Sequence, residues 1–340
     1  MLLSKFKIGV GPMSSEIINL ILEYAHITET PIMIIASRNQ VDHDLGYVSN
    51  TRNLVAKIKS SIYYDSSKIL ICRDHCGPYF RDDEKSKNIT QATANCLATI
   101  ENDIENGFDI LHIDVGKVNK DPYKIADSLI SRALHLNPEI ILEFGSEDNT
   151  MENLDDLTHL NNNINYVKQF KNVKFLVNKT GSLTKHTQVG NFILNRNRSI
   201  ADKIHAEGLL FKEHNADYLN KEQLLLRKLC GIDAINIAPE LACAQTKCLL
   251  QFAPYFPASF FEFKNFVLKS ELWKKWTDYD NKELQFVVSA HYFYNHKLGI
   301  DIRMTLNKIA EFKSLLRKEV FSILDKYSHY LLKDEYDSCK

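Results

Sequence analysis

The feature that most constrains the fold is a series of eight short apolar runs separated by longer amphipathic segments. The runs are KIGVG (7–11), PIMIIAS (31–37), KILICRDH (68–75), DILHIDVG (109–116), EIILEFG (139–145), VKFLVNKTG (173–181), GLLFKEH (208–214) and AINIAPE (234–240). Several are rich in Ile and Val at successive positions. This pattern is typical of strands in a parallel sheet that helices cover on both faces.

The segments between the runs carry helix signals. SSEIINLILEYA (14–25) begins with serines and has a Glu in its first turn, as helices often do. QATANCLATIENDIENG (91–107) ends on a glycine, which is common just after a helix. Eight strand–helix units within roughly 250 residues predict an α/β fold of the (β/α)8 TIM-barrel type.

The chain after residue 250 has a different pattern. It is aromatic and helix-like and contains no strand-like run, as in FAPYFPASFFEFKNFVLKSELWKKW (252–276). We therefore expect a barrel domain over residues 1–250. A helical extension over residues 251–340 is expected to pack on the barrel or on a partner subunit.

Composition excludes several classes of partner. The chain has 42 basic and 43 acidic residues, which leaves no basic excess to hold the phosphates of a nucleic acid. No apolar run reaches membrane-spanning length, and the N-terminal apolar stretch is too short for a signal peptide. Seven cysteines without a CxxC pair favour a reduced protein in the cytoplasm.

Polar side chains follow nearly every apolar run, at the positions where barrel enzymes place their active sites. A purely structural barrel would not require this at all of its strand ends, so the pattern predicts an enzyme. The residues are Ser37, Arg38, Asn39 and Gln40; Asp74 and His75; His112 and Asp114; Glu143; Thr180, Gly181 and Ser182; Glu213 and His214; and Asn236 and Glu240.

Several of these stretches carry a family resemblance. They are SRNQVD (37–42), RDHC (73–76), LEFGSED (142–148), KEHNADYL (212–219) and GIDAINIAPEL (231–241). Together they resemble the class II, metal-dependent ketose-bisphosphate aldolases. More closely, they resemble the tagatose-bisphosphate aldolase subunit family of the GatZ/KbaZ type. The closer resemblance runs from about residue 5 to HYFY (291–294), whereas the class II aldolase pattern covers the barrel only.

The resemblance implies aldol and retro-aldol chemistry at the C3–C4 bond of a ketose phosphate. Asp74 would be the acid/base that exchanges a proton with the C4 hydroxyl. Glu147, or its neighbour Asp148, would remove the proton that forms the enediolate. Asn236 would hold the enediolate or a substrate hydroxyl.

The remaining polar residues at the strand ends would bind the substrate. Their short side chains and backbone N–H groups suit a phosphate or hydroxyls. The residues given this role are Ser37, Asn39, Gly181 and Ser182.

The chemistry requires a cation in the absence of a Schiff-base lysine. Cleavage leaves negative charge next to a carbonyl, and a divalent metal can stabilise it as a Lewis acid. Zinc is the expected ion, because three imidazoles leave open positions for substrate oxygens. The candidate ligands are His75, His186 and His214, with Glu143 as the substitute for one of them.

Two departures from the aldolase pattern bear on the substrate. Where the aldolases have a glycine- and serine-rich loop that holds one phosphate, this chain has Asn215-Ala216-Asp217. Pro239 then lacks an N–H donor. Both changes fall where the aldolases bind the dihydroxyacetone-phosphate end. The substrate therefore carries its phosphate elsewhere, carries only one, or carries none.

Three functions are consistent with these residues. The first is a metal-dependent enzyme on a tagatose- or fructose-type ketose phosphate, as an aldolase or as a 4-epimerase that breaks and re-forms the same bond. The second is a non-catalytic supporting subunit of a class II tagatose-bisphosphate aldolase. The third is a metal-dependent sugar isomerase. The expected partners are a small sugar phosphate and either further copies of this chain or a separate aldolase subunit.

Overall fold

The computed structural model describes residues 3–145, 157–178, 180–181 and 184–332. Glu147, Asp148 and Ser182, which the sequence analysis assigns to the site, lie outside these residues.

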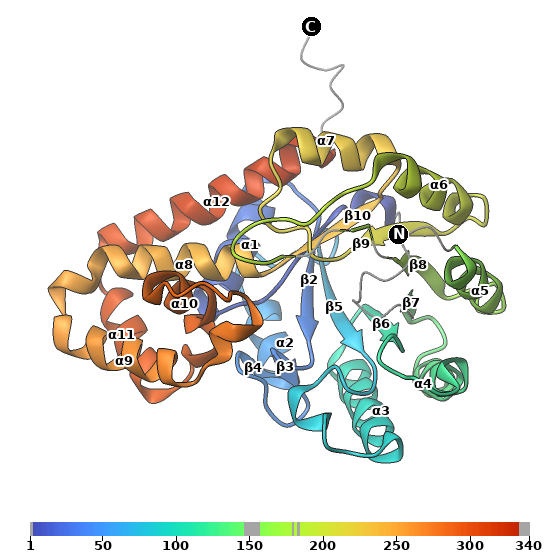
Figure 1. Ribbon diagram of the computed structural model, residues 1–340, viewed down its shortest axis with the longest axis horizontal. Helices are drawn as coiled ribbons and strands as arrows, with labels where there is room; N and C mark the ends of the chain where they lie inside the picture. Colours follow the sequence, from blue (N-terminus) through green and yellow to red (C-terminus); the bar gives the residue numbers. More distant parts are fainter. Residues whose placement is uncertain (1–2, 146–156, 179, 182–183, 333–340) are drawn as a thin grey trace, which may run out of the picture.

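Eight parallel strands close into a barrel, which confirms the predicted TIM-barrel fold (Figure 1). Each strand coincides with one of the eight apolar runs. β1 and β10 close the barrel with Gly9 paired to Asn236. The strands are β1 (Ile8–Val10), β2 (Ile32–Ser37), β5 (Ile69–Cys76), β6 (Ile110–Asp114), β7 (Ile141–Gly145), β8 (Val173–Val177), β9 (Leu210–Glu213) and β10 (Ala234–Ile237).

Helices follow the strands and surround the barrel. They are α1 (Ser15–Thr28), α2 (Thr51–Lys59), α3 (Ile89–Asn106), α4 (Pro122–Leu136), α5 (Thr158–Val167), α6 (Leu194–His205), α7 (Lys221–Cys230) and α8 (Pro239–Phe252). Local sequence explains several of their ends. Ser14 caps α1 by accepting a hydrogen bond from the N–H of Ile17, and α3 ends at Gly107, whose φ of 84° favours glycine.

Four short elements in the first part of the chain were not predicted, of which the first is a 3-10 helix at Leu3–Lys5. A two-stranded sheet of β3 (Val41–Asp42) and β4 (Ser49–Asn50) lies in the connection after β2, and a 3-10 helix (Asp82–Glu84) follows β5. Elements of two or three residues are too short to show a hydrophobic period.

The interior of the barrel is apolar at one end and polar at the other. A buried cluster fills the apolar end; its members are Phe6, Met33, Ile35, Leu70, Cys72, Ile110, Phe175 and Ala234. Successive residues of a strand alternate between the inside and the outside. Asp74 therefore follows Leu70 and Cys72 on the inner face, at the mouth formed by the carboxyl ends of the strands.

In its described residues, the region after β10 consists of helices joined by short connections, and it packs against the barrel. After α8 come α9 (Pro257–Lys269), α10 (Lys282–Ser289), α11 (Lys297–Leu306) and α12 (Ala310–Leu332), with short 3-10 helices at 253–255, 272–275 and 290–293. The helices α8 to α11 lie together at one side of the barrel, on the left in Figure 1, and α12 returns along α8 to α7. The boundary proposed after residue 250 falls within the last turn of α8.

The C-terminal region reaches the loops around the barrel mouth. Lys275 forms an ion pair of 2.5 Å with Asp82 after β5. Asn295 donates hydrogen bonds to the backbone carbonyls of Tyr47 and Val48 after β3. No helix in the described part of the chain is long and apolar enough to cross a membrane.

Candidate active site

The end of β5 has an irregular backbone that turns two adjacent side chains toward the barrel mouth. The pairing of β5 with β6 shifts register between Arg73 and Cys76. His75 has a φ of 48°, in the left-handed region that few residues other than glycine adopt. Gly77 follows because a Cβ there would lie 1.5 Å from the carbonyl oxygen of Asp114. This turn lets Asp74 and His75 reach the same space.

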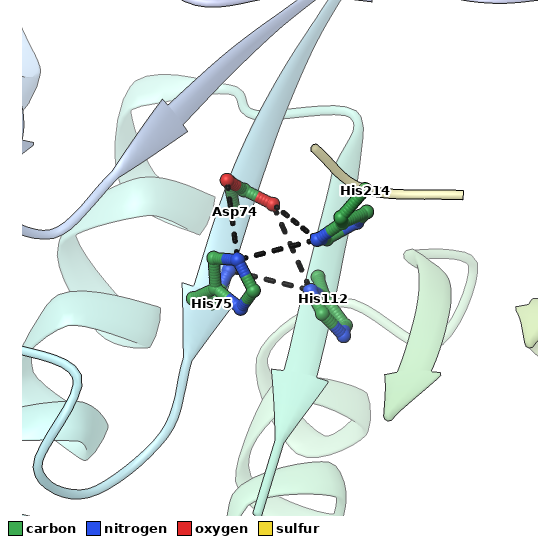
Figure 2. A group of neighbouring side chains, drawn as sticks. All are labelled: Asp74, His75, His112 and His214. Carbon is green, nitrogen blue, oxygen red and sulfur yellow. Dashed lines mark hydrogen bonds and ion pairs between the residues drawn. The ribbon is translucent and has the colours of Figure 1, made fainter. Parts of the chain in front are cut away.

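Asp74 and His75 meet two further histidines from other strands (Figure 2). His112 comes from β6, and His214 follows the last residue of β9. The four side chains each offer one donor atom, and these atoms all lie within 4.8 Å of one another. His75 Nε2 lies 3.2 Å from His214 Nδ1. Asp74 Oδ1 lies 3.6 Å from His214 Nδ1 and 3.8 Å from His112 Nδ1. We call these four residues the Asp–His cluster.

A second carboxylate orients the first histidine. His75 Nδ1 lies 2.6 Å from Asp114 Oδ2, and the other oxygen of Asp114 accepts a hydrogen bond from the N–H of Gly116. The ring of His75 also stacks on Phe80, with centroids 5.0 Å apart. A carboxylate behind one ring nitrogen is the arrangement that directs the other nitrogen toward a metal.

The electrostatics of the cluster keep the carboxylate charged. Burial alone would raise the pKa of Asp74, but the neighbouring imidazoles of His75 and His214 outweigh it and hold this pKa well below its usual range. Burial lowers the pKa of His75, yet Asp74 and Asp114 raise it overall to about 9. Burial holds the pKa of His214 well below its usual value, so this ring is neutral. Neutral imidazole is the form that binds a metal.

Several polar atoms at the mouth are buried without a hydrogen-bond partner. Among the described residues these include Asp74 Oδ1, His214 Nε2, and both amide atoms of Asn236. Leaving such an atom unsatisfied costs about 1–3 kcal/mol. The carboxyl ends of the strands therefore gather polar atoms that a bound ion or substrate would satisfy.

The donor set suits a divalent metal. Three imidazoles and a carboxylate are the usual ligands of zinc and of related transition metals. His112 is part of this set, although the sequence analysis gave it no role. Two signals in the sequence pointed to it: its place in a strand-end run, and its spacing of two residues from Asp114, which puts both side chains on one face of β6.

The structure does not bring His186 into the Asp–His cluster. This residue lies after β8, where its N–H donates to the carbonyl of Trp276 over 2.9 Å. Its ring nitrogens lie 2.9 Å from Thr277 Oγ1 and 3.2 Å from Asp278 Oδ1. The ring stacks on Tyr279. The spacing of His186 in the sequence resembled that of a ligand, but contacts with the distant C-terminal region determine its position.

Glu143, the predicted substitute ligand, is engaged elsewhere. It lies on β7 inside the barrel, and its carboxylate forms an ion pair of 2.6 Å with Lys212. Both side chains are buried. Lys212 precedes His214 by two residues and shares its inward face. The ammonium group of Lys212 thus pairs with the carboxylate that was predicted to bind the metal.

The predicted substrate-binding residues differ in their surroundings. Asn236 lies beside Gly9 of the neighbouring strand β1, where a Cβ would lie 2.1 Å from the amide oxygen of Asn236. Ser37 ends β2 and is paired in register with Asp74. The side chain of Asn39 links the loop after β2 to the loop after β5, since it donates a hydrogen bond to the carbonyl of Phe80 and accepts one from the N–H of Asp82.

Gly181, the other described residue of this group, has a structural reason to be glycine. Its φ is 94°, and a Cβ there would lie 2.0 Å from the carbonyl oxygen of Asn191. Of the four residues predicted to bind phosphate or hydroxyls, only Ser37 is paired with a residue of the Asp–His cluster in the described structure.

Comparison with protein families gives a match over the first part of the barrel. Residues 9–142 match the family described as D-tagatose-1,6-bisphosphate aldolase subunit GatZ/KbaZ-like. The predicted resemblance to this family is confirmed over these residues. The matched stretch includes Asp74, His75 and His112 of the Asp–His cluster, and His214 lies beyond it.

Solved structures share the fold over nearly the whole chain. A probable tagatose 6 phosphate kinase from Sinorhizobium meliloti 1021 aligns with a TM-score of 0.79 and 20% identity, covering 96% of this chain and 100% of its own. The YdjI aldolase from Escherichia coli K12 aligns with a TM-score of 0.58 and 12% identity, covering 98% and 94%. A fructose-bisphosphate aldolase from Campylobacter jejuni aligns with a TM-score of 0.60 and 10% identity, covering 96% and 90%. At these identities the likeness concerns the fold.

Proposed function

We propose that this chain is a metal-dependent enzyme that performs aldol and retro-aldol chemistry at the C3–C4 bond of a ketose phosphate. It would act on a tagatose- or fructose-type sugar, as an aldolase or as a 4-epimerase. The observation that carries the proposal is the Asp–His cluster at the carboxyl ends of the barrel strands. The match to the GatZ/KbaZ-like family and the fold shared with aldolases support it.

His75, His112 and His214 would hold the divalent metal, with zinc as the proposed ion, and Asp74 stands beside them. When bound, the metal supplies Lewis-acid stabilisation of the negative charge that develops next to the substrate carbonyl.

Asp74 is the proposed acid/base. Its carboxylate is held ionised, so it can accept the proton of the C4 hydroxyl when the C3–C4 bond breaks. It returns the proton when the bond forms again. Asn236 is proposed to hold a substrate oxygen, because both of its amide atoms are buried and unpartnered in the described structure. Glu147 remains the proposed base for the proton next to the carbonyl.

Because the same residues would serve an aldolase and an epimerase, only the reaction products can distinguish the two activities. The test is metal analysis of the purified chain, followed by NMR of the metal-loaded protein with a panel of ketose mono- and bisphosphates. We expect about one metal per chain and either cleavage to two three-carbon products or inversion at C4. A protein that holds metal but leaves every ketose unchanged, or only moves protons between C1 and C2, would contradict the proposal. The second result would favour the sugar isomerase.

A supporting subunit is the second candidate, because the matched family is described as an aldolase subunit. A subunit without chemistry has no need for a charged carboxylate beside three converging imidazoles. Activity of the isolated chain would exclude a purely supporting role. Activity that appears only with a separate aldolase chain, and that survives Asp74→Asn, would establish it.

We also propose a cytoplasmic location. The cysteines in the described part of the chain are free and buried. This pattern is typical of proteins kept in a reducing compartment.

A further inference from the structure

The loops after the last two barrel strands form the phosphate site in many (β/α)8 barrels. That site uses the loops after strands 7 and 8 and the N-terminus of a nearby helix, whose N–H groups bind anions. In this chain the equivalent strands are β9 and β10. α8 begins at Pro239, directly after β10, and therefore presents its N-terminus at the barrel mouth.

A carboxylate of the chain already occupies this helix N-terminus. Asp217, in the loop after β9, accepts a hydrogen bond from the N–H of Ala238 over 2.9 Å and another from the N–H of Glu240 over 2.8 Å. Pro239, between them, has no N–H to offer. Asp217 is 2% exposed, so its buried side chain occupies the space in front of these N–H groups.

A second carboxylate, that of Glu240, lies in the first turn of the same helix. Glu240 accepts a hydrogen bond from the N–H of Tyr218 over 2.8 Å and one from the hydroxyl of Tyr327 over 2.6 Å. Its other oxygen accepts from Lys326 over 2.7 Å. Both Tyr327 and Lys326 belong to α12, so the C-terminal helix holds this arrangement in place.

We propose that Asp217 is a specificity-determining residue that closes this anion site. The enzyme would then select ketoses without a phosphate at C1, the end next to the carbonyl. This inference rests on the proposed function of the Asp–His cluster. A phosphate at C1 would have to displace the two hydrogen bonds that the N–H groups of Ala238 and Glu240 donate to Asp217, and it would lie against the carboxyl groups of Asp217 and Glu240. A phosphate at the other end of the sugar meets no such obstacle from Asp217.

The test compares ketoses that differ only in a C1 phosphate, such as fructose 6-phosphate and fructose 1,6-bisphosphate, together with the tagatose pair. Binding to the metal-loaded protein is measured by calorimetry and turnover by NMR. In the wild type we expect the C1 phosphate to weaken binding by about tenfold or more. Asp217→Gly frees both N–H groups and should remove this difference. Asp217→Asn keeps a capping oxygen without the charge and should reduce it several-fold.

Asn220→Gly is the matched control. Asn220 caps α7 in the same loop by accepting a hydrogen bond from the N–H of Gln223 over 2.9 Å. Its loss should lower stability and leave the discrimination unchanged. The proposal is overturned if the wild type binds both members of a pair equally, or if neither Asp217 variant changes the ratio.

Inorganic phosphate separates this inference from the proposed function. If no ketose binds to the metal-loaded wild type, the proposed function fails. A phosphorus NMR titration still tests the closed site, since Asp217→Gly should bind inorganic phosphate about tenfold more tightly than the wild type. Equal phosphate binding by the two proteins would overturn the closed site by itself.

Discussion

At the scale of single residues, the candidate site depends on the direction in which successive side chains leave β5. Arg73 points outward, where its guanidinium pairs with Asp103 of α3 over 2.6 Å. Asp74 points inward, and the left-handed backbone of His75 turns that ring into the same space. The carboxylate and the imidazole therefore stand together, although side chains of adjacent residues in a regular strand face opposite ways.

The role of Asp74 is tested by substitution. Asp74→Ala should retain metal and bind substrate, because the three histidines remain, yet turnover should fall by about 10²–10⁴-fold, the usual contribution of a positioned acid/base. Exchange of the proton next to the carbonyl, followed by NMR in deuterated water, should persist. His75→Ala is the comparison and should lose metal and exchange together. Near wild-type turnover in Asp74→Ala would show that the carboxylate is structural.

Asp114 should act on metal affinity through His75. Asp114→Asn leaves a side chain of the same size but removes the charge that orients the imidazole. We expect metal affinity to fall by about 10–100-fold, the usual effect of losing such a partner. A competitive chelator titration measures it. Asp109→Asn is a suitable control, because Asp109 also contacts a neighbouring strand, through the N–H of Ile71. An unchanged affinity in Asp114→Asn would refute the orienting role.

At the scale of elements, contacts with the C-terminal region shape the loops of the barrel mouth. The loops after β3, β5 and β8 each bond to residues between 275 and 295. The loops after β9 and β10 are joined to α12 through Tyr327. Helices that follow the barrel in sequence thus support the edge at which its side chains converge.

His186 provides a test of this interpretation. His186→Ala removes the bond to Thr277 and the stacking on Tyr279, so unfolding by urea should occur at lower denaturant. We expect a loss of about 1–2 kcal/mol in the free energy of unfolding. Metal content should remain that of the wild type. Loss of metal from His186→Ala, with stability unchanged, would instead support the ligand role predicted from sequence.

At the scale of the whole molecule, stability in the absence of metal should depend on pH through His75. Its pKa is raised from the ordinary 6.5 to about 9, so folding favours the protonated ring. This stabilisation is fully present below pH 6.5 and is lost as pH rises through 9. Between about pH 7 and 8.5, the free energy of unfolding of the chelator-treated protein should fall by up to 1.4 kcal/mol per pH unit.

The pH window isolates His75 from the other shifted groups. His214 is neutral in the folded state, and above pH 7 it is largely neutral in the unfolded chain as well. Burial raises the pKa of Asp217 from 3.8 to about 7, so the stability linked to this group is lost as pH rises between these two values, mostly below the window in which His75 is tested. His75→Gln should therefore abolish the slope. Urea unfolding at a series of pH values measures it, and an identical slope in wild type and variant would assign the effect to other groups.

The fold could be predicted because strand and helix periods are local properties. Each of the eight apolar runs became one barrel strand, and glycines and caps marked several helix ends. The convergence of three side chains could be predicted for a related reason. Asp74, His75 and His214 stand at strand ends, and parallel barrel strands bring those ends to one mouth.

The sequence by itself therefore determined the barrel, its eight strands and the mouth at which the polar strand ends gather, since hydrophobic period and strand direction are enough for that. Only the tertiary structure decided which side chains meet. It brought His112 into the Asp–His cluster, paired Glu143 with Lys212 and held His186 against the C-terminal region. These outcomes depend on strand register and on contacts between residues some 30 to 90 positions apart, which no local pattern records.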